Sequence, residues 1–353
     1  MMFGNYSETC SVRTEDVEDV IRKKLEILLK EGTQVPADED KEDLELPPYY
    51  DDKKFKFAQI CFHNNLFTMM IAKLSGLLTL LAIPSILDIL IFTKQSGTPC
   101  AAFRRYFSTI LHTFIWYEKN PLKAKEFFNS LRTVRRKHCL ASRKCFQGGL
   151  RRITQTDMAI TQFGFIGFTL MSAEQLGVKA TEEELEGIVH FWRVIGYMLG
   201  MEEKYNLCNG TVEECRILCR LLLNEVFIPL FEKGNEKFDE MGRILIEAMW
   251  PFIPFLDPKA FTSFTLQLAI SATINNNHSI VNETSSLPFK SKLLLNLQLN
   301  VHKYLMPTKH WWSAIFRAIF NFLLRLAIFL TENYPLLLYT TFGKKAIVKF
   351  HNE

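Results

Sequence analysis

The stretch RYFSTILHTFIWYEKNPLKAKEFFNSLRTVRRKH, from Arg105 to His138, is the part of the chain from which the fold can be interpreted. At 3.6 residues per turn, one side of a first predicted helix carries Arg105, Thr109, His112 and Trp116. A second predicted helix has an apolar stripe that contains one imidazole, made of Leu131, Val134, His138, Ala141 and Cys145. Cations cover the rest of that helix: Arg132, Arg135, Arg136, Lys137, Arg143 and Lys144.

The imidazole of His138 allows two interpretations. A histidine on an apolar face with cations nearby suits the axial ligand of a haem, because the iron needs a neutral ring nitrogen in a dry pocket and the propionates need positive charges. A histidine that is simply buried and hydrogen-bonded would give the same pattern. Spacing alone leaves both interpretations open.

Four motifs occur in the same order as in a known protein family. They are Arg105-x-x-x-Thr109, the Val134-Arg-x-x-His138 helix, Ile153-Thr-Gln-Thr-Asp157-Met-Ala-Ile-Thr-Gln-Phe-Gly164, and His190-Phe-Trp-Arg-Val-Ile-Gly-Tyr-Met-Leu-Gly200. Together they resemble the latex-clearing protein (rubber oxygenase) family, which includes membrane-bound oxygenases of fungal pathways. The resemblance runs from about Leu46 to Asn209.

The resemblance implies a globin-like helical core around haem b. In that family an Arg, a Thr and a His lie around the haem, and the His is the proximal iron ligand. Carried over to this sequence, these roles fall on Arg105 and Thr109 as pocket residues and on His138 as the metal ligand. The implied reaction is oxidative cleavage of a carbon–carbon double bond with dioxygen.

Two further family features match this sequence only loosely. A glutamate upstream of the Arg-x-x-x-Thr motif is thought to act as a base, and Asp88 lies near that spacing, although a buried ion pair of Asp88 with Lys73 or an Arg fits as well. Some members use a lysine just before the Thr as a second axial ligand, where this chain has Ser108. His112 is the local substitute, either as a distal ligand or as a hydrogen-bonding neighbour.

A second polar stripe is expected on the helix that begins with the capping box Thr181-Glu-Glu-Glu184. This stripe contains His190 and Arg193, which could hydrogen-bond a distal ligand or contact propionates. A structural network that anchors the helix to the core is the alternative. His302 and His310 have no partner at a useful spacing and receive no role.

Composition excludes several classes of protein. The formal charge of +4 is too small to indicate a nucleic-acid-binding protein, and no nucleic-acid motif occurs. Eight cysteines without a Cys-x-x-Cys pair argue against zinc ribbons and covalently attached haem. With 48% apolar and 13% aromatic residues and no alternating strand pattern, the chain is expected to be all-α.

The domain division expected from these patterns has three parts: a polar N-terminal extension over 1–45, a haem-binding helical domain over 46–300, and a hydrophobic tail over 301–353. The apolar run from Leu66 to Phe92 predicts two packed helices that bend at Pro84, rather than a membrane span. Residues 311–330 predict either a helix in a membrane interface, with Arg317 and Arg325 toward lipid phosphates, or a helix that packs on the domain.

The sequence therefore favours a haem b oxygenase that uses dioxygen on an apolar substrate such as a polyprenyl or lipid chain. The expected location is intracellular, at the membrane of the endoplasmic reticulum. Two alternatives remain: a non-catalytic haem- or lipid-binding protein, and a membrane-associated structural protein without cofactor. A Soret band would exclude the structural protein without cofactor. Dioxygen consumption with an isoprenoid would then distinguish the oxygenase from the non-catalytic binding protein.

Overall fold

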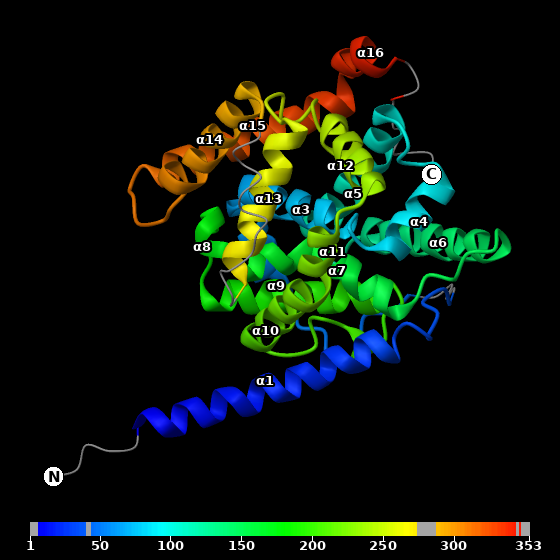
Figure 1. The fold of residues 1–353 in the computed structure, drawn as a ribbon, viewed down its shortest axis with the longest axis vertical. Helices are drawn as coiled ribbons and strands as arrows, with labels where there is room; N and C mark the ends of the chain where they lie inside the picture. Colours follow the sequence, from blue (N-terminus) through cyan, green and yellow to red (C-terminus); the bar gives the residue numbers. More distant parts are fainter. Residues whose placement is uncertain (1–5, 40–43, 274–286, 344–345, 347–353) are drawn as a thin grey trace.

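Helices make up all the regular secondary structure in the computed structural model, which describes residues 6–39, 44–273, 287–343 and 346. Within these residues the all-α prediction is confirmed, and one isolated bridge, between Pro36 and Thr154, is the sole strand-like pairing. The helices form one domain (Figure 1). In chain order they are α1 (Tyr6–Lys30), α2 (Asp52–Asn64), α3 (Leu66–Leu80), α4 (Pro84–Thr93), α5 (Pro99–Glu118), α6 (Lys125–Gln147), α7 (Gln155–Met171), α8 (Ala173–Leu176), α9 (Glu182–Met198), η1 (Glu203–Tyr205), α10 (Val212–Leu222), η2 (Leu223–Phe227), α11 (Ile228–Lys233), α12 (Glu236–Ala248), α13 (Pro258–Ala272), α14 (Phe289–Asn300), η4 (Val301–Leu305), α15 (Ser313–Asn333) and α16 (Leu336–Phe342).

The centre of the molecule is the packing of α3 along α7, with α2 packed along α9 beside it. Nearly every residue of α7 is buried, and most of these side chains are apolar, as is usual for an enclosed helix. At the crossing, a Cβ added to Gly76 would lie 2.2 Å from the carbonyl oxygen of Gly164. The two backbones can approach this closely because neither residue has a side chain.

The bend predicted at Pro84 is present. Helix α3 ends at Leu80 and α4 begins at Pro84, with an angle of 93° between them. Pro84 occupies the first helical position, where a missing N–H costs nothing. Most of α3 is buried, in agreement with two packed helices. By length and composition, α15 is the one single helix of the described residues that could cross a membrane, and the bent pair α3–α4 passes the same test together.

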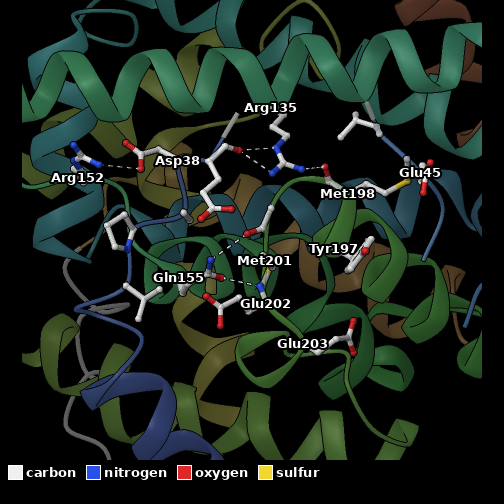
Figure 2. A pocket seen from close by; sticks show the side chains of 16 residues that line it. Asp38, Glu45, Arg135, Arg152, Gln155, Tyr197, Met198, Met201, Glu202 and Glu203 are labelled. Atoms are coloured by element: carbon white, nitrogen blue, oxygen red, sulfur yellow. Dashed lines mark hydrogen bonds and ion pairs between the residues drawn. The ribbon is translucent and has the colours of Figure 1, made fainter. Parts of the chain in front are cut away.

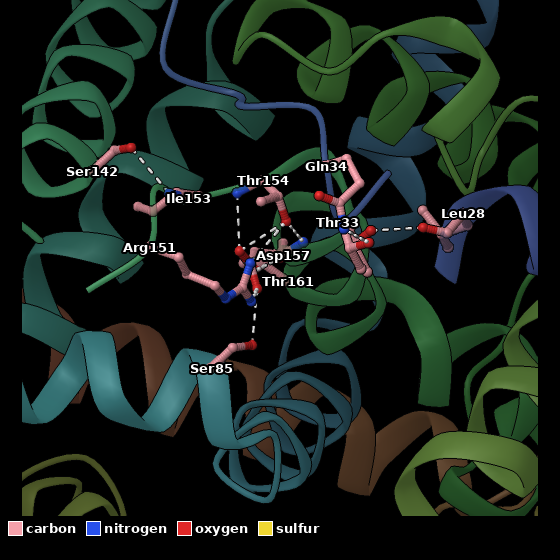
Figure 3. Close-up of polar contacts among 11 residues, drawn as sticks. Leu28, Thr33, Gln34, Ser85, Ser142, Arg151, Ile153, Thr154, Asp157 and Thr161 are labelled. Atoms are coloured by element: carbon pink, nitrogen blue, oxygen red, sulfur yellow. Dashed lines mark hydrogen bonds and ion pairs between the residues drawn. The ribbon is translucent and has the colours of Figure 1, made fainter. Parts of the chain in front are cut away.

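Asp157 is the hub of a polar cluster at the beginning of α7 (Figure 3). Its carboxylate accepts hydrogen bonds from the backbone N–H of Thr154 at 2.9 Å and from the hydroxyl of Ser85 at 3.0 Å. Arg151 forms an ion pair with it at 2.7 Å. Asp157 therefore caps α7 and also joins α7 to the first turn of α4.

The second half of α1 and the segment after it pack on the domain. Ile21, Leu25 and Leu28 on α1 belong to the hydrophobic core. Beyond the helix, the backbone of 35–37 bonds to that of 153–155, and the carboxylate of Asp38 is buried against Ser142 at 2.9 Å. Residues 1–5 and 40–43 of the expected extension lie outside the described residues.

Candidate functional site

Helices α5 and α6 form a hairpin that brings the two halves of the Arg105–His138 stretch together. The hydroxyl of Ser130 on α6 accepts a hydrogen bond from the indole N–H of Trp116 at 2.9 Å and lies 2.7 Å from Nδ1 of His112. Two turns further along α6, His138 is close enough to Arg105 for the guanidinium charge to act on the imidazole. These pairings, 112 with 130 and 105 with 138, show that the helices run antiparallel.

His138 lies deep in the protein as a neutral imidazole. Burial lowers the pKa of His138 to about 4, and the positive charge of Arg105 lowers it further. Its Nδ1 is buried and has no hydrogen-bond partner among the described residues. Leaving such a nitrogen unpaired costs about 1–3 kcal/mol. No protein group in the described part of the chain therefore occupies this ring nitrogen.

Arg105 faces His138 from α5. Burial lowers the pKa of Arg105, and its Nη1 donates a long hydrogen bond of 3.4 Å to the hydroxyl of Ser96. In the described part of the chain no carboxylate forms an ion pair with it. A guanidinium inside a protein is expensive without an anion. The site therefore has an uncompensated positive charge beside an unpaired imidazole.

Thr109 and its neighbours border this pair. The hydroxyl of Thr109 donates to the carbonyl of Arg105 at 3.1 Å, which leaves its oxygen able to accept a further hydrogen bond. Several side chains of this part of the hairpin are only partly buried: Arg105, Ser108 and Thr109 on α5, and Val134, His138 and Ala141 on α6.

Lys73, which the sequence predicted only as a possible ion-pair partner of Asp88, lies next to this site. Its side chain on α3 is 5% exposed, and its Nζ donates to the hydroxyl of Thr113 at 2.9 Å and lies 4.7 Å from the ring centre of Phe165. Burial lowers the pKa of Lys73 to about 7. Thr113 in turn donates to the carbonyl of Thr109, so the amine lies one helical turn from the pocket residues.

Asp88 lies at the surface, whereas the sequence predicted a base near the site or a member of a buried ion pair. Its side chain on α4 is 51% exposed and forms an ion pair with Lys237 at 3.9 Å, in place of the expected buried pair with Lys73 or an Arg. Helix α4 turns away from α3 at Pro84, and this bend directs Asp88 to the surface. An exposed carboxylate keeps its hydration, so its presence there requires no functional explanation.

His190 and Arg193 lie together, but in a different group from Arg105 and His138. The backbone N–H of Asp51 donates to Nε2 of His190 at 3.0 Å. Arg193 forms an ion pair with Glu203 at 2.7 Å and lies 4.0 Å from the ring centre of Tyr49. These contacts tie α9 to the segments before α2 and at η1, which is the anchoring network considered as the alternative.

His112 likewise has a structural partner, because it meets Ser130 where the α5–α6 hairpin is closed. Its hydrogen bond matches the role of a hydrogen-bonding neighbour, the alternative to a distal ligand.

His302, which received no role, is 4% exposed and stacks between Phe67 and Phe264. Its Nδ1 is 3.0 Å from the carbonyl of Leu176, and burial lowers its pKa to about 4. No spacing in the sequence reveals this burial.

A pocket of about 590 Å³ lies on another side of α6 and does not include His138 (Figure 2). Arg135, expected on the cationic outer surface of α6, is buried in its wall, where Nη1 donates to the carbonyl of Met198 at 3.1 Å and Nη2 to that of Glu39 at 2.8 Å. Gln155 bonds to the backbone of Gly200 and Glu202. The pocket is lined by several carboxylates, whose hydration an apolar substrate could not replace.

Comparison with known proteins agrees with the expected fold. No protein-family model and no curated protein matches the sequence. A solved structure of latex clearing protein in the closed state is similar over 91% of this chain and 87% of that chain, with a TM-score of 0.50 and 14% sequence identity. At this identity the likeness concerns the arrangement of the helices. The chain described here therefore has the all-α fold of latex clearing protein.

Proposed function

We propose that the protein binds haem b in the α5–α6 hairpin through His138 and uses dioxygen to oxidise an apolar, isoprenoid-like substrate. The observation that carries this proposal is the pairing, among the described residues, of a buried imidazole nitrogen without a hydrogen-bond partner and a buried guanidinium without a carboxylate partner. Iron ligation requires a neutral imidazole, and a haem propionate would neutralise Arg105.

The donor set suits haem better than a free metal ion. Among the described residues no group of three or more His, Cys, Asp or Glu side chains is placed to hold a metal. A porphyrin brings four nitrogen ligands of its own, so one histidine is a sufficient protein ligand. When bound, haem b would supply the activation of dioxygen, which no amino-acid side chain provides.

The residues around the hairpin have separate roles in this proposal. Arg105 binds and orients an anionic group, while the apolar side chains of Val134 and Ala141 exclude water. Lys73 can hold or release a proton at Nζ near neutral pH, one turn from Thr109. Such a base would replace Asp88, whose surface position argues against the role that the resemblance implied for it.

The substrate class is proposed from two lines of support. The fold is that of a protein named for clearing latex, and the sequence motifs resemble those of the rubber oxygenases. Around Arg105, Ser108, Thr109 and His138, the hairpin also presents the apolar side chains of Val134 and Ala141. A hydrocarbon chain would lose no hydrogen bonds on entering such a site.

A non-catalytic haem- or lipid-binding protein is the second candidate. It is favoured by Ser108, which stands where members of the resembled family can have a lysine, and by the exposure of Asp88. Such a protein would keep the haem-binding pair His138 and Arg105 without turnover.

The test begins with the full chain, purified and mixed with haemin. We expect a Soret band that shifts on reduction and is lost in His138→Ala, while the helical circular dichroism stays unchanged. His310→Ala is the matched control, because His310 is partly exposed and stacks on Trp312 away from the hairpin. Full haem content in His138→Ala with an unchanged spectrum would overturn the proposed ligand.

The second arm measures dioxygen consumption by the haem-loaded protein with an isoprenoid substrate. Consumption above that of His138→Ala supports the oxygenase. Haem binding without any dioxygen consumption identifies the non-catalytic alternative.

A further inference from the structure

Helix α15 is inside out relative to an ordinary surface helix. Its buried side chains are mostly polar or charged, whereas its exposed side chains are mostly apolar. An amphipathic helix on a soluble domain normally presents the opposite arrangement. The expectation that Arg317 and Arg325 turn toward lipid phosphates is therefore wrong, because both point into the protein.

Hydrogen bonds dock the polar face of α15 onto the domain. Arg317 is 7% exposed and donates to the side-chain oxygen of Asn65 at 3.0 Å and to the carbonyls of Gly177 at 2.6 Å and Met306 at 3.1 Å. These partners lie at the α2–α3 junction, after α8 and after η4. The guanidinium thus joins three parts of the fold.

Asn321 and Arg325 continue the docking along the same helix face. Asn321 accepts from the backbone N–H of Phe67 at 2.9 Å and donates to the carbonyl of Asn64 at 2.8 Å. Arg325 donates to Nδ1 of His63 at 2.8 Å. Inserting α15 across a bilayer would break all these bonds and carry two guanidinium groups into hydrocarbon, so the docked helix does not span.

The outer face of α15, as we use the term, is the set of its exposed large apolar side chains: Ile315, Ile319, Phe322, Leu323, Leu326, Phe329 and Leu330. They are between 38% and 63% exposed. Trp311, just before the helix, is 77% exposed. Scattered apolar residues need no explanation, but a whole helix face of them marks a contact with something apolar.

The charges around this face indicate its partner. From 287 to 331 the chain contains lysines and arginines but no aspartate or glutamate, and Glu332 in the last turn of α15 is the first acidic residue after them. Four of these cations are exposed around the helices α14, η4 and α15: Lys290, Lys292, Lys303 and Lys309. A second copy of the chain would present the same cations and be repelled, whereas anionic lipid headgroups complement them.

We propose that α15 lies in the plane of a bilayer that contains anionic lipids, with its outer face among the acyl chains and its polar face docked to the domain. The nearby lysines then contact phosphates, and the exposed Trp311 lies at the interface that tryptophan prefers. Figure 1 places α15 at the opposite end of the molecule from α1, so the remainder of the domain projects away from the membrane. The inference does not depend on haem binding.

The experiment is co-flotation of the full-length protein with vesicles of phosphatidylcholine, with and without phosphatidylserine. We expect binding to the anionic vesicles that added salt weakens without abolishing. The double variant Phe322→Gln with Leu323→Gln should bind at least about ten-fold more weakly, because two large apolar side chains are replaced by polar ones that gain nothing from entering the acyl region. Both residues are more than half exposed, so folding should not change.

The matched control is Val17→Gln with Val20→Gln, which changes two exposed apolar residues on α1 and should leave vesicle binding unchanged. Absence of binding by the wild-type protein, or equal loss in both double variants, would overturn the proposal. Dimerisation of the lipid-free wild-type protein that the α15 variant abolishes would also overturn it, by identifying the face as a contact between copies. Haem content, measured in parallel, should be the same in all variants.

Discussion

Replacing Lys73 by methionine should stabilise the protein at neutral pH, although it removes a hydrogen bond. The amine is 5% exposed, and its hydrogen-bond partner is the hydroxyl of Thr113. That hydroxyl still donates to the carbonyl of Thr109 after the change, so no donor is left unpaired. Methionine keeps most of the volume, and its sulfur packs well against the ring of Phe165.

The magnitude follows from the pKa of Lys73, which burial lowers from 10.5 to about 7. Each unit corresponds to about 1.4 kcal/mol, so burial of the charged amine costs at most about 5 kcal/mol below pH 7. With the loss of a hydrogen bond worth about 1 kcal/mol, we expect Lys73→Met to raise the free energy of unfolding by about 2–4 kcal/mol at pH 7.

The sign of the pH dependence is fixed by which state binds the proton. Between about pH 7 and about pH 10 the unfolded wild-type chain has a protonated lysine and the folded chain a neutral one. Wild-type stability therefore rises with pH in this window, by up to about 1.4 kcal/mol per pH unit, and the advantage of Lys73→Met shrinks equally.

Urea unfolding followed by circular dichroism, at several values between about pH 7 and about pH 9.5, measures this difference. Lys123→Met is the control, since Lys123 is exposed and should give no pH-dependent change. A Lys73→Met variant that is less stable than wild type at pH 7, or whose advantage does not vary with pH, would refute the reasoning. If the prediction holds, Lys73 destabilises the folded protein, and a role in function is the simplest explanation for its presence.

Three further outcomes are expected. Arg105→Ala should weaken haemin binding, measured by titration of the Soret band, by about ten-fold or more through loss of a charge-assisted contact, and unchanged affinity would contradict its role. The wild-type protein should lose stability as the pH falls from about 6.5 to about 4, because only the unfolded chain protonates His302 there, the buried imidazole having a pKa of about 4. His302→Phe should make this loss smaller. If urea unfolding shows the same dependence of the free energy of unfolding on pH for variant and wild type, the prediction is contradicted. Gly76→Ala should lower the melting temperature sharply, since its Cβ would lie 2.2 Å from the carbonyl oxygen of Gly164, whereas Gly97→Ala, with nothing within 4 Å, should leave it unchanged.

Features that depend on neighbouring residues were predictable from the sequence. The bend at Pro84 follows from the missing N–H and fixed φ of proline, and the capping boxes at Thr154 and Thr181 follow from local hydrogen bonding. The pairing of Arg105 with His138 was also accessible, because helical periodicity places each on the inner face of its helix and a short connection makes the helices antiparallel.

Tertiary structure alone decided where each helix face points. Asp88 and Lys73 both interrupt apolar segments, yet one is at the surface and the other is buried, because α4 turns away at Pro84 while α3 runs through the core. His302 resembles an ordinary surface histidine in the sequence, but η4 packs it between two phenylalanines. On α15 the period correctly separated a polar from an apolar stripe. Periodicity states which side chains share a face, but whether that face meets protein or solvent depends on partners distant in the chain, such as Asn65 and Gly177 for Arg317.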